Sequence, residues 1–296
     1  MPSWLAYLTV VLVWATTPLA IKWSAEALPP VMAGMARMML AVVIGLLWLW
    51  LQRQRLVWSR DALRSYALAL PGVFAAMALS YLASRYVQSG MISVMFGLAP
   101  LLSGLMMQVL PNNVRLNRWH WMGCSLGVVG LAVVFIDGLH AGGDTVIGML
   151  LLFCAVSGFA SSGILVKRYA MSMPPLKQTL GALILSLPLY ALLSFALGEE
   201  ATLGDNLMGL WAILYLAVFG SLIGFVCYFL ILSRMSAATV SLVTLITPVL
   251  ALLLGGWFNG EEPHANVVFG AGLILSALAL YIFGDRRVRK AVLASP

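Results

Sequence analysis

The sequence predicts an all-α membrane protein with ten transmembrane helices in two inverted five-helix repeats. Three observations support this fold class. The chain has 296 residues, of which 62% are hydrophobic and only 9% charged, too few charges to cover a soluble surface of this size. The connectors between its apolar stretches alternate in charge, and its two halves share spaced residue patterns.

Ten apolar stretches are each long enough to cross a bilayer, which takes roughly 20 residues for about 30 Å of hydrocarbon. Helices are expected because backbone groups in lipid must be satisfied within the segment. Barrel strands would be half as long and would alternate polar and apolar residues. In chain order the expected spans are 3–22, 31–51, 63–83, 88–110, 119–137, 146–166, 177–197, 207–230, 237–258 and 265–284.

The placement of the charges predicts the orientation. The formal excess of +7 lies in short connectors beside the spans, which argues against a nucleic-acid partner. By the positive-inside rule both termini face the cytoplasm, as an even number of spans also requires. We therefore expect a multi-pass protein of a bacterial-type inner membrane. The basic connectors and the tail carry Arg53, Arg55, Arg60, Arg64, Arg115, Arg118, Lys167, Arg168, Lys177, Arg234, Arg286, Arg287, Arg289 and Lys290. The other connectors carry Glu26, Asp137, Asp144, Glu199, Glu200, Asp205, Glu261 and Glu262.

The halves 1–143 and 144–296 carry matching patterns at offsets of 145 to 148 residues. An aromatic residue, two hydroxyls and a lysine recur in register in spans one and six, and a serine and a proline recur in spans four and nine. Because each half has five spans, the second half must enter the membrane from the opposite side, an arrangement typical of transporters. The matched segments are Trp14–Lys22 with Phe159–Lys167, Ser93–Pro100 with Ser241–Pro248, and Gly123–Gly127 with Gly270–Ile274.

Motifs spread over almost the whole chain carry a family resemblance. They are Trp14–Lys22, Leu28-Pro-Pro30, Arg37, Ala78-Leu-Ser-Tyr81, Leu98-Ala-Pro100, Leu214–Gly224, Cys227-Tyr-Phe229, Ser236-Ala-Ala238, Pro248 and Gly260-Glu261. At these positions the chain resembles the EamA-type transporters of the drug/metabolite transporter superfamily. The resemblance implies a central cavity lined mainly by helices one, three, four, six, eight and nine, with helices five and ten at the periphery. One departure is Pro111-Asn-Asn-Val-Arg115, where the family often has a glutamate after helix four, as Glu261 follows helix nine.

The resemblance places several polar-tipped, aromatic or soft side chains on the helices expected to line the cavity. The alternative for each is ordinary packing, since aromatic residues in membrane helices often face lipid and Ser or Thr often bond their own backbone. The candidate substrate-binding residues are Trp14, Thr17, Tyr81, Met95, Phe159, Ser162, Phe225, Tyr228 and Thr244.

Three cations lie on the outer side of the expected membrane region. Arg37 lies well inside span two, about seven residues or roughly 10 Å from its outer edge, and intramembrane charge is usually functional. We expect a gating or locking role, with direct substrate contact or outward snorkelling as alternatives. Lys22 and Arg85 are expected at the outer ends of helices one and three, either favoured by the helix dipole or forming a cationic rim.

Prolines are expected to interrupt helices one, three, four and nine, at Pro18, Pro71, Pro100 and Pro248. A proline frees one carbonyl and bends the helix. Pro100 and Pro248 occupy matching places in the two halves, which favours a shared hinge role over static packing kinks.

The missing residue types restrict the function. No Asp, Glu or His lies in the interior of a span, no P-loop occurs, and no metal-ligand or nucleophile-base spacing appears. Neither an enzyme, a metal site nor a cofactor is therefore expected. The sequence instead predicts an inner-membrane secondary carrier that exports a small organic metabolite, such as an amino acid or a related amphipathic amine, by alternating access. A monomer would suffice. The alternatives are a multidrug efflux carrier, then a sugar-nucleotide or other anion carrier, which ranks low because Arg37 is the only cation deep inside a span, and, in a different class, a non-transporting membrane receptor or scaffold.

Overall fold

The computed structural model describes residues 1–109, 117–141, 143–169, 173–202, 204, 206–235, 240 and 243–294, with no description of the side chains of 109, 135–141, 245 and 282–294. The described residues form helices and the loops that connect them, and they contain no strand. The expected features at Pro111–Arg115, Ser236–Ala238 and Ser241 and the side chains of the basic tail lie outside this description. The helices are α1 (Ser3–Ala27), α2 (Pro30–Leu51), α3 (Arg60–Leu70), α4 (Ala76–Ala83), α5 (Ser89–Phe96), α6 (Ala99–Val109), α7 (Arg118–Ala141), α8 (Gly143–Tyr169), α9 (Pro175–Ala196), α10 (Leu207–Tyr215), α11 (Gly224–Arg234), α13 (Val243–Asn259) and α14 (Ala265–Ala294), with π-helical segments η1 (Pro71–Ala75) and η2 (Leu216–Ile223).

Seven of the described helical segments are long and apolar enough to cross a membrane: Ser3–Ala27, Pro30–Leu51, Arg60–Ala83, Ser89–Gln108, Gly143–Tyr169, Pro175–Ala196 and Leu207–Arg234. Within α13 and α14, the segments Ile246–Asn259 and Ala265–Tyr281 are apolar but shorter. The first helix corrects one expectation, because α1 continues to Ala27 instead of ending at Lys22. The residue that follows the helix, Leu28, has an extended backbone, because a residue before proline disfavours the helical region.

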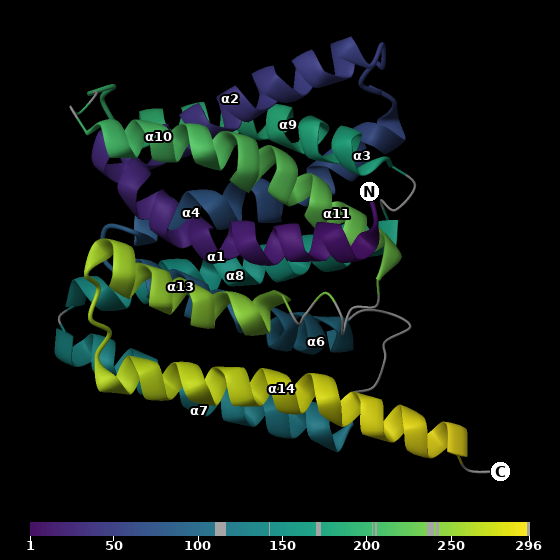
Figure 1. The fold of residues 1–296 in the computed structure, drawn as a ribbon, viewed down its shortest axis with the longest axis vertical. Helices are drawn as coiled ribbons and strands as arrows, with labels where there is room; N and C mark the ends of the chain where they lie inside the picture. Colours follow the sequence, from purple (N-terminus) through teal and green to yellow (C-terminus); the bar gives the residue numbers. More distant parts are fainter. Residues whose placement is uncertain are drawn as a thin grey trace.

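The helices lie side by side along one common direction (Figure 1). α1 begins and α14 ends at the same end of the bundle, where the connection between α2 and α3 with Arg53 and Arg55 also lies. We call this the basic end. At the opposite, acidic end, Glu26 accepts a hydrogen bond from Asn206, and Glu199 and Glu261 accept hydrogen bonds at the starts of α2 and α5.

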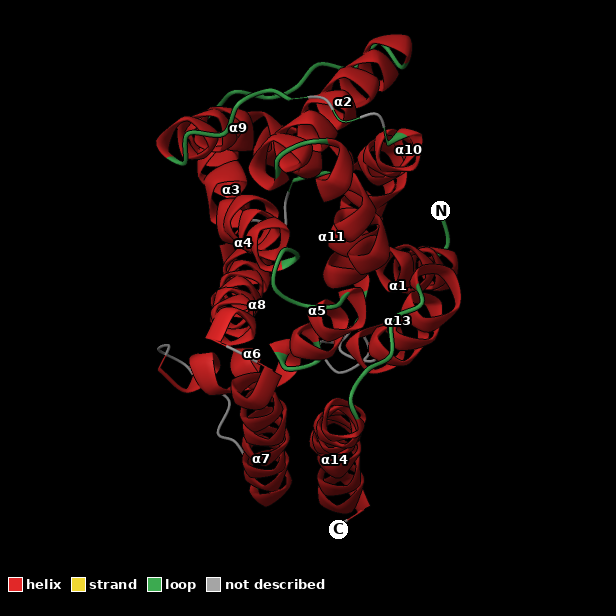
Figure 2. Ribbon diagram, turned by 90° about the vertical axis from the view of Figure 1, so that its left-hand side faces the viewer, coloured by secondary structure: helices red, strands yellow, loops and turns green. Residues whose placement is uncertain are grey.

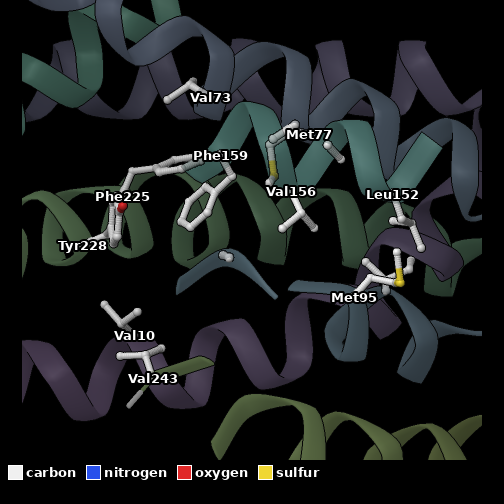
Figure 3. Packing of buried hydrophobic residues seen from close by; sticks show 14 of the residues in the cluster. Val10, Val73, Met77, Met95, Leu152, Val156, Phe159, Phe225, Tyr228 and Val243 are labelled. Atoms are coloured by element: carbon white, nitrogen blue, oxygen red, sulfur yellow. The ribbon is translucent and has the colours of Figure 1, made fainter. Parts of the chain in front are cut away.

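The helix α1 lies at the centre of the packing, against α10, α11 and α13, while α4 packs on α8 and α2 on α9. The core between them is filled by residues such as Met77, Met95, Leu152, Val156 and Phe159 (Figure 3).

The pair formed by α7 and α14 stands apart from the rest of the bundle (Figures 1 and 2). Its two helices pack mostly against each other. A Cβ built on Gly130 would lie 2.9 Å from the carbonyl oxygen of Gly270, and one built on Gly270 would lie 2.9 Å from that of Gly130. Glycine therefore lets the two backbones approach closely, as small residues do between membrane helices.

Several other helices are interrupted near the middle of the bundle. π-helical segments follow α3 and α10, and their first residues, Pro71 and Leu216, are offset by 145 residues. A two-residue turn at Gly97 and Leu98 separates α5 from α6, so the expected span 88–110 is not one continuous helix. Such irregularities are often found at functional sites.

Candidate functional site

A cavity of about 60 Å³ lies among these interrupted helices. Its lining comes from α1, α2, α4, α5, α8, η2, α11 and α13, and mixes aromatic rings, hydroxyls and one guanidinium. The lining residues are Trp14, Thr17, Pro18, Ile21, Arg37, Met77, Ser80, Ile92, Ser93, Phe96, Phe159, Gly220, Phe225, Thr244 and Thr247.

The structure brings five of the sequence-derived candidates into this lining: Trp14, Thr17, Phe159, Phe225 and Thr244. Thr17 donates its hydroxyl to the carbonyl of Val13 at 2.7 Å, a bond that leaves the oxygen lone pairs available. Ser80, which also lines the cavity, donates in the same way to Ala76 at 2.7 Å.

The other four candidates lie elsewhere. Ser162 is 3.3 and 3.2 Å from the carbonyls of Leu68 and Ala69, beside the break at Pro71. Met95 and Tyr81 are fully buried in the packing, and the Tyr228 ring lies tilted against those of Trp14 and Phe159. These four residues are therefore not in the lining of this cavity, and their role in substrate binding stays a prediction.

Trp14, Phe159 and Tyr228 form a compact group of rings, which we call the aromatic cluster. Its ring centroids are 5.1 to 5.5 Å apart, and Phe96 adds an edge contact to Phe159 at 5.7 Å. Phe159, Phe225 and Tyr228 gather on the same side of the core (Figure 3). The Trp14 indole lies against Gly224, so the cluster lies on the side of the cavity toward the basic end.

Arg37 is the charged residue of the cavity, and its side chain is only 1% exposed. Its Nε donates to the hydroxyl of Ser221 at 2.6 Å, and Ser221 in turn donates to the sulfur of Met38. Its Nη1 is buried without a hydrogen-bond partner among the described residues. The burial rules out outward snorkelling, and Glu26, at the acidic end, is bound to Asn206.

The chain matches known transporters over nearly its full length. The model of the EamA-like transporter family matches residues 1–136 and 146–283. The chain belongs to the EamA-like transporter family. The match confirms the resemblance drawn from the motifs and makes this chain a membrane transporter.

Several relatives of this EamA-like transporter carry names that bear on its role. It is 24% identical to the uncharacterized inner membrane transporter YedA of Escherichia coli K12, covering 96% of this chain and 92% of that protein. It is 25% identical to a probable amino-acid metabolite efflux pump of the same organism, covering 96% of each. A crystal structure that is 20% identical superposes with a TM-score of 0.67 over 96% of this chain and 98% of that one, which supports the fold.

The two hinge candidates of the transporter occupy different positions in their helices. Pro248 is inside α13, while Pro100 lies in the first turn of α6, just after the Gly97–Leu98 turn. The helix was expected to be interrupted at Pro100, and the interruption lies at Gly97 and Leu98, two to three residues before it. Proline has no N–H, so Pro248 cannot donate to the carbonyl of Thr244. A Cβ built on Gly97 would lie 3.7 Å from that carbonyl oxygen, so the carbonyl lies beside the turn that precedes Pro100.

The rim candidates are engaged at the acidic end and do not line the cavity. Lys22 donates to the carbonyl of Val87 at 3.2 Å. Arg85 lies 3.8 Å from Glu199, whose carboxylate also accepts from the backbone amides of Val31 and Met32 at the start of α2. These contacts join the ends of neighbouring helices.

Sequence reasoning did not single out several residues that contact Arg37 or line the cavity. Ser221 and Gly220, which hold the Arg37 guanidinium, lie 184 and 183 positions from it in the chain, and no local pattern links them. Ser80, Ser93 and Phe96 were recognisable only as parts of motifs. A usable signal was the Gly220 and Gly224 pair, since glycines four apart let another side chain approach a membrane helix.

Proposed function

We propose that this EamA-like transporter is an inner-membrane secondary carrier that exports small organic metabolites by alternating access. Amino acids or related amphipathic amines are its first expected substrates. In this proposal ten transmembrane helices form two inverted repeats, 1–143 and 144–296, with the basic end and both termini in the cytoplasm. A monomer suffices for transport.

The observation that carries the proposal is the central cavity, whose lining comes from both halves of the chain. Trp14, Arg37 and Ser93 come from the first half, and Phe159 and Thr244 from the second. The two family matches fall in these same halves, and the π-helical segments recur at the offset of the sequence repeat. The relative named as a probable amino-acid metabolite efflux pump supports the substrate class.

The size of the cavity fits a carrier in a contracted conformation. Its volume of about 60 Å³ is well below the roughly 300–1,000 Å³ of typical ligand sites. A metabolite therefore requires the lining helices to separate. The interrupted helices offer the places where such a movement needs the fewest broken backbone hydrogen bonds.

The direct test is transport by the purified protein in proteoliposomes loaded with labelled amino acids. We expect movement well above that of empty vesicles. Movement of structurally unrelated cationic dyes without any amino acid would replace this proposal with multidrug efflux. Movement of no amino acid, amine or drug would refute the carrier proposal for those classes.

Side accessibility separates a carrier from a non-transporting receptor or scaffold. In a background with Cys124, Cys154 and Cys227 replaced by alanine, Thr17→Cys should react with a membrane-impermeant thiol reagent in a substrate-dependent way. Val129→Cys on α7, whose side chain is 52% exposed on the outside of the bundle, is the control and should not respond. A Thr17→Cys reactivity that is independent of every transported solute would favour the scaffold.

We also propose transport without a dedicated proton-binding carboxylate. None of the described residues that line the cavity is Asp, Glu or His, and a buried carboxylate is the usual proton carrier in a coupled transporter. Transport should therefore continue without an imposed pH gradient. A strict need for the gradient, lost on changing an acid such as Asp137 or Glu261, would refute this part.

A further inference from the structure

Arg37 brings a buried positive charge into the membrane without a matching negative one. A guanidinium offers five N–H donors, yet the described residues provide one hydrogen bond, from Nε to Ser221, and leave Nη1 buried and unpartnered. Leaving a charged donor unsatisfied in a low-dielectric site is costly. Because Arg37 lines the cavity, an anionic group bound there would supply an acceptor that the guanidinium lacks.

The described residues contain no acid that could pair with Arg37. The single ion pair among them joins Arg85 to Glu199 at the acidic end. Glu26 is bound to Asn206, and Glu261 accepts hydrogen bonds from Ser89, Gly90 and Asn259. The cavity is therefore a cationic site, open to an anionic group.

The apolar part of the cavity lies next to this charge. The guanidinium packs against Gly220, and the Trp14 indole packs against Gly224 on the same helix. The two glycines are four residues apart, across the junction of η2 and α11, so the guanidinium and the indole lie at different levels along the bundle. This separation corresponds to a small solute with a charged group at one end and an apolar body at the other.

We propose that the Arg37 guanidinium binds the carboxylate of the transported solute, and that Trp14 and Phe159 of the aromatic cluster, which line the cavity, hold its apolar body on the side of the basic end. This inference rests on the proposed carrier function and narrows its substrate class: of the amino acids and amphipathic amines proposed above, it keeps only the solutes that carry a carboxylate. The preferred solutes are amphipathic monocarboxylates, amino acids included. An amine without a carboxylate brings a second positive charge beside Arg37 and meets no acid, so it is rejected.

Three probes with the same phenyl body test this assignment: 3-phenylpropanoate, phenylalanine and phenethylamine. Their binding to the purified full-length protein is measured by thermal shift, and their ability to compete with transport is measured in proteoliposomes. We expect the two carboxylates to bind at least about tenfold more tightly than the amine, as for one charge-assisted hydrogen bond.

Arg37→Gln should weaken both carboxylates by roughly tenfold to a hundredfold and leave the amine unchanged or improved. Arg37→Lys, which keeps the charge but loses the planar fork, should retain part of the preference. Arg64→Gln is the matched control, because this arginine lies at the basic end over the Tyr169 ring and should leave the preference intact.

Equal binding of phenethylamine and the carboxylates to the natural protein would overturn the inference, even if Arg37→Gln did not fold. So would a carboxylate preference that survives in a folded Arg37→Gln variant, or a failure of both carboxylates to bind. If the protein binds carboxylates through Arg37 but moves no solute, the carboxylate site stands and the carrier proposal fails.

Discussion

The α7–α14 pair and the cavity-lining helices are both largely apolar, but they differ in how their backbones pack. α7 and α14 are uninterrupted, and their backbones meet directly at Gly130 and Gly270. The helices around the cavity are broken at Pro71, Gly97 and Leu216 and enclose polar groups. The first arrangement fixes two helices together, while the second leaves backbone groups that can be rearranged. We therefore expect the α7–α14 pair to stay rigid and movement to occur among the helices around the cavity.

The sharpest way to break this comparison is to separate α7 from α14. Gly270→Ala places a methyl group 2.9 Å from the carbonyl oxygen of Gly130, and we expect a loss of about 3 kcal/mol of stability, as for overpacking at a backbone contact. The measurement is thermal unfolding in detergent. Substrate preference should not change, because neither residue lines the cavity.

Gly272→Ala is the matched control on the same helix. A Cβ at Gly272 meets nothing within 4 Å, so alanine should stabilise the helix slightly, by up to about 1 kcal/mol. If both variants behaved alike, the close approach of the two backbones would not be what holds the pair.

The second prediction concerns the support of the buried charge. Ser221→Ala removes the acceptor for Arg37 Nε, leaving a second guanidinium nitrogen unsatisfied, and should cost about 2 kcal/mol of stability. It should also lower the affinity for transported solutes, because the guanidinium loses its fixed position. Ser233→Ala is the control, since Ser233 is exposed and bonds the carbonyl of Leu230 in its own helix. Unchanged stability and affinity in Ser221→Ala would show that the cavity does not depend on this contact.

The third prediction tests the movable region. Pro248→Ala restores a possible donor to the carbonyl of Thr244 and should stiffen α13. We expect turnover to fall by about tenfold, corresponding to about 1.4 kcal/mol in the barrier, with little change in binding. Pro100→Ala should bias the protein toward the opposite-facing state.

Pro188→Ala controls for the loss of a proline from a membrane helix. Pro188 lies inside α9 and is exposed on the outside of the bundle, so its replacement should leave turnover near that of the natural protein. Normal turnover in all three variants, with unchanged accessibility from each side, would reduce Pro100 and Pro248 to packing features.

Much of the helical architecture could be predicted because lipid leaves a chain few alternatives. Backbone groups in hydrocarbon must be paired locally, so long apolar stretches such as those in α2 and α9 had to be helices. The prolines also marked real irregularities at Pro71 and near Pro100. The π-helical segment η2 contains no proline, so no local sequence signal predicted this irregularity.

The rotation of each helix about its axis could not be predicted. In a soluble protein the apolar face of a helix shows which side is buried. In a membrane this signal is lost, because both the lipid and the protein core are apolar. Ser162 matches Thr17 in the sequence repeat, yet it faces the break at Pro71 while Thr17 lines the cavity. The partner of Arg37 depended on the same information, since Ser221 reaches it only through the packing of α2 on η2.

The smallest expected effect concerns the acidic end, where fixed and movable helices are joined. The Glu261 carboxylate accepts from the amide and hydroxyl of Ser89 and from the amide of Gly90, so it caps the start of α5. Glu261→Gln keeps the shape but removes the charge that favours a helix N-terminus, and should cost about 1 kcal/mol of stability. Glu200→Gln, at an exposed neighbour of the capping Glu199, is the control and should leave the stability unchanged.

Because α5 carries Ser93 and Phe96 into the cavity, a loosened cap should also raise the rate at which Ser93→Cys reacts from the acidic side. If Glu261→Gln left both unfolding and this reactivity unchanged, the carboxylate would be a surface group without a role in positioning α5.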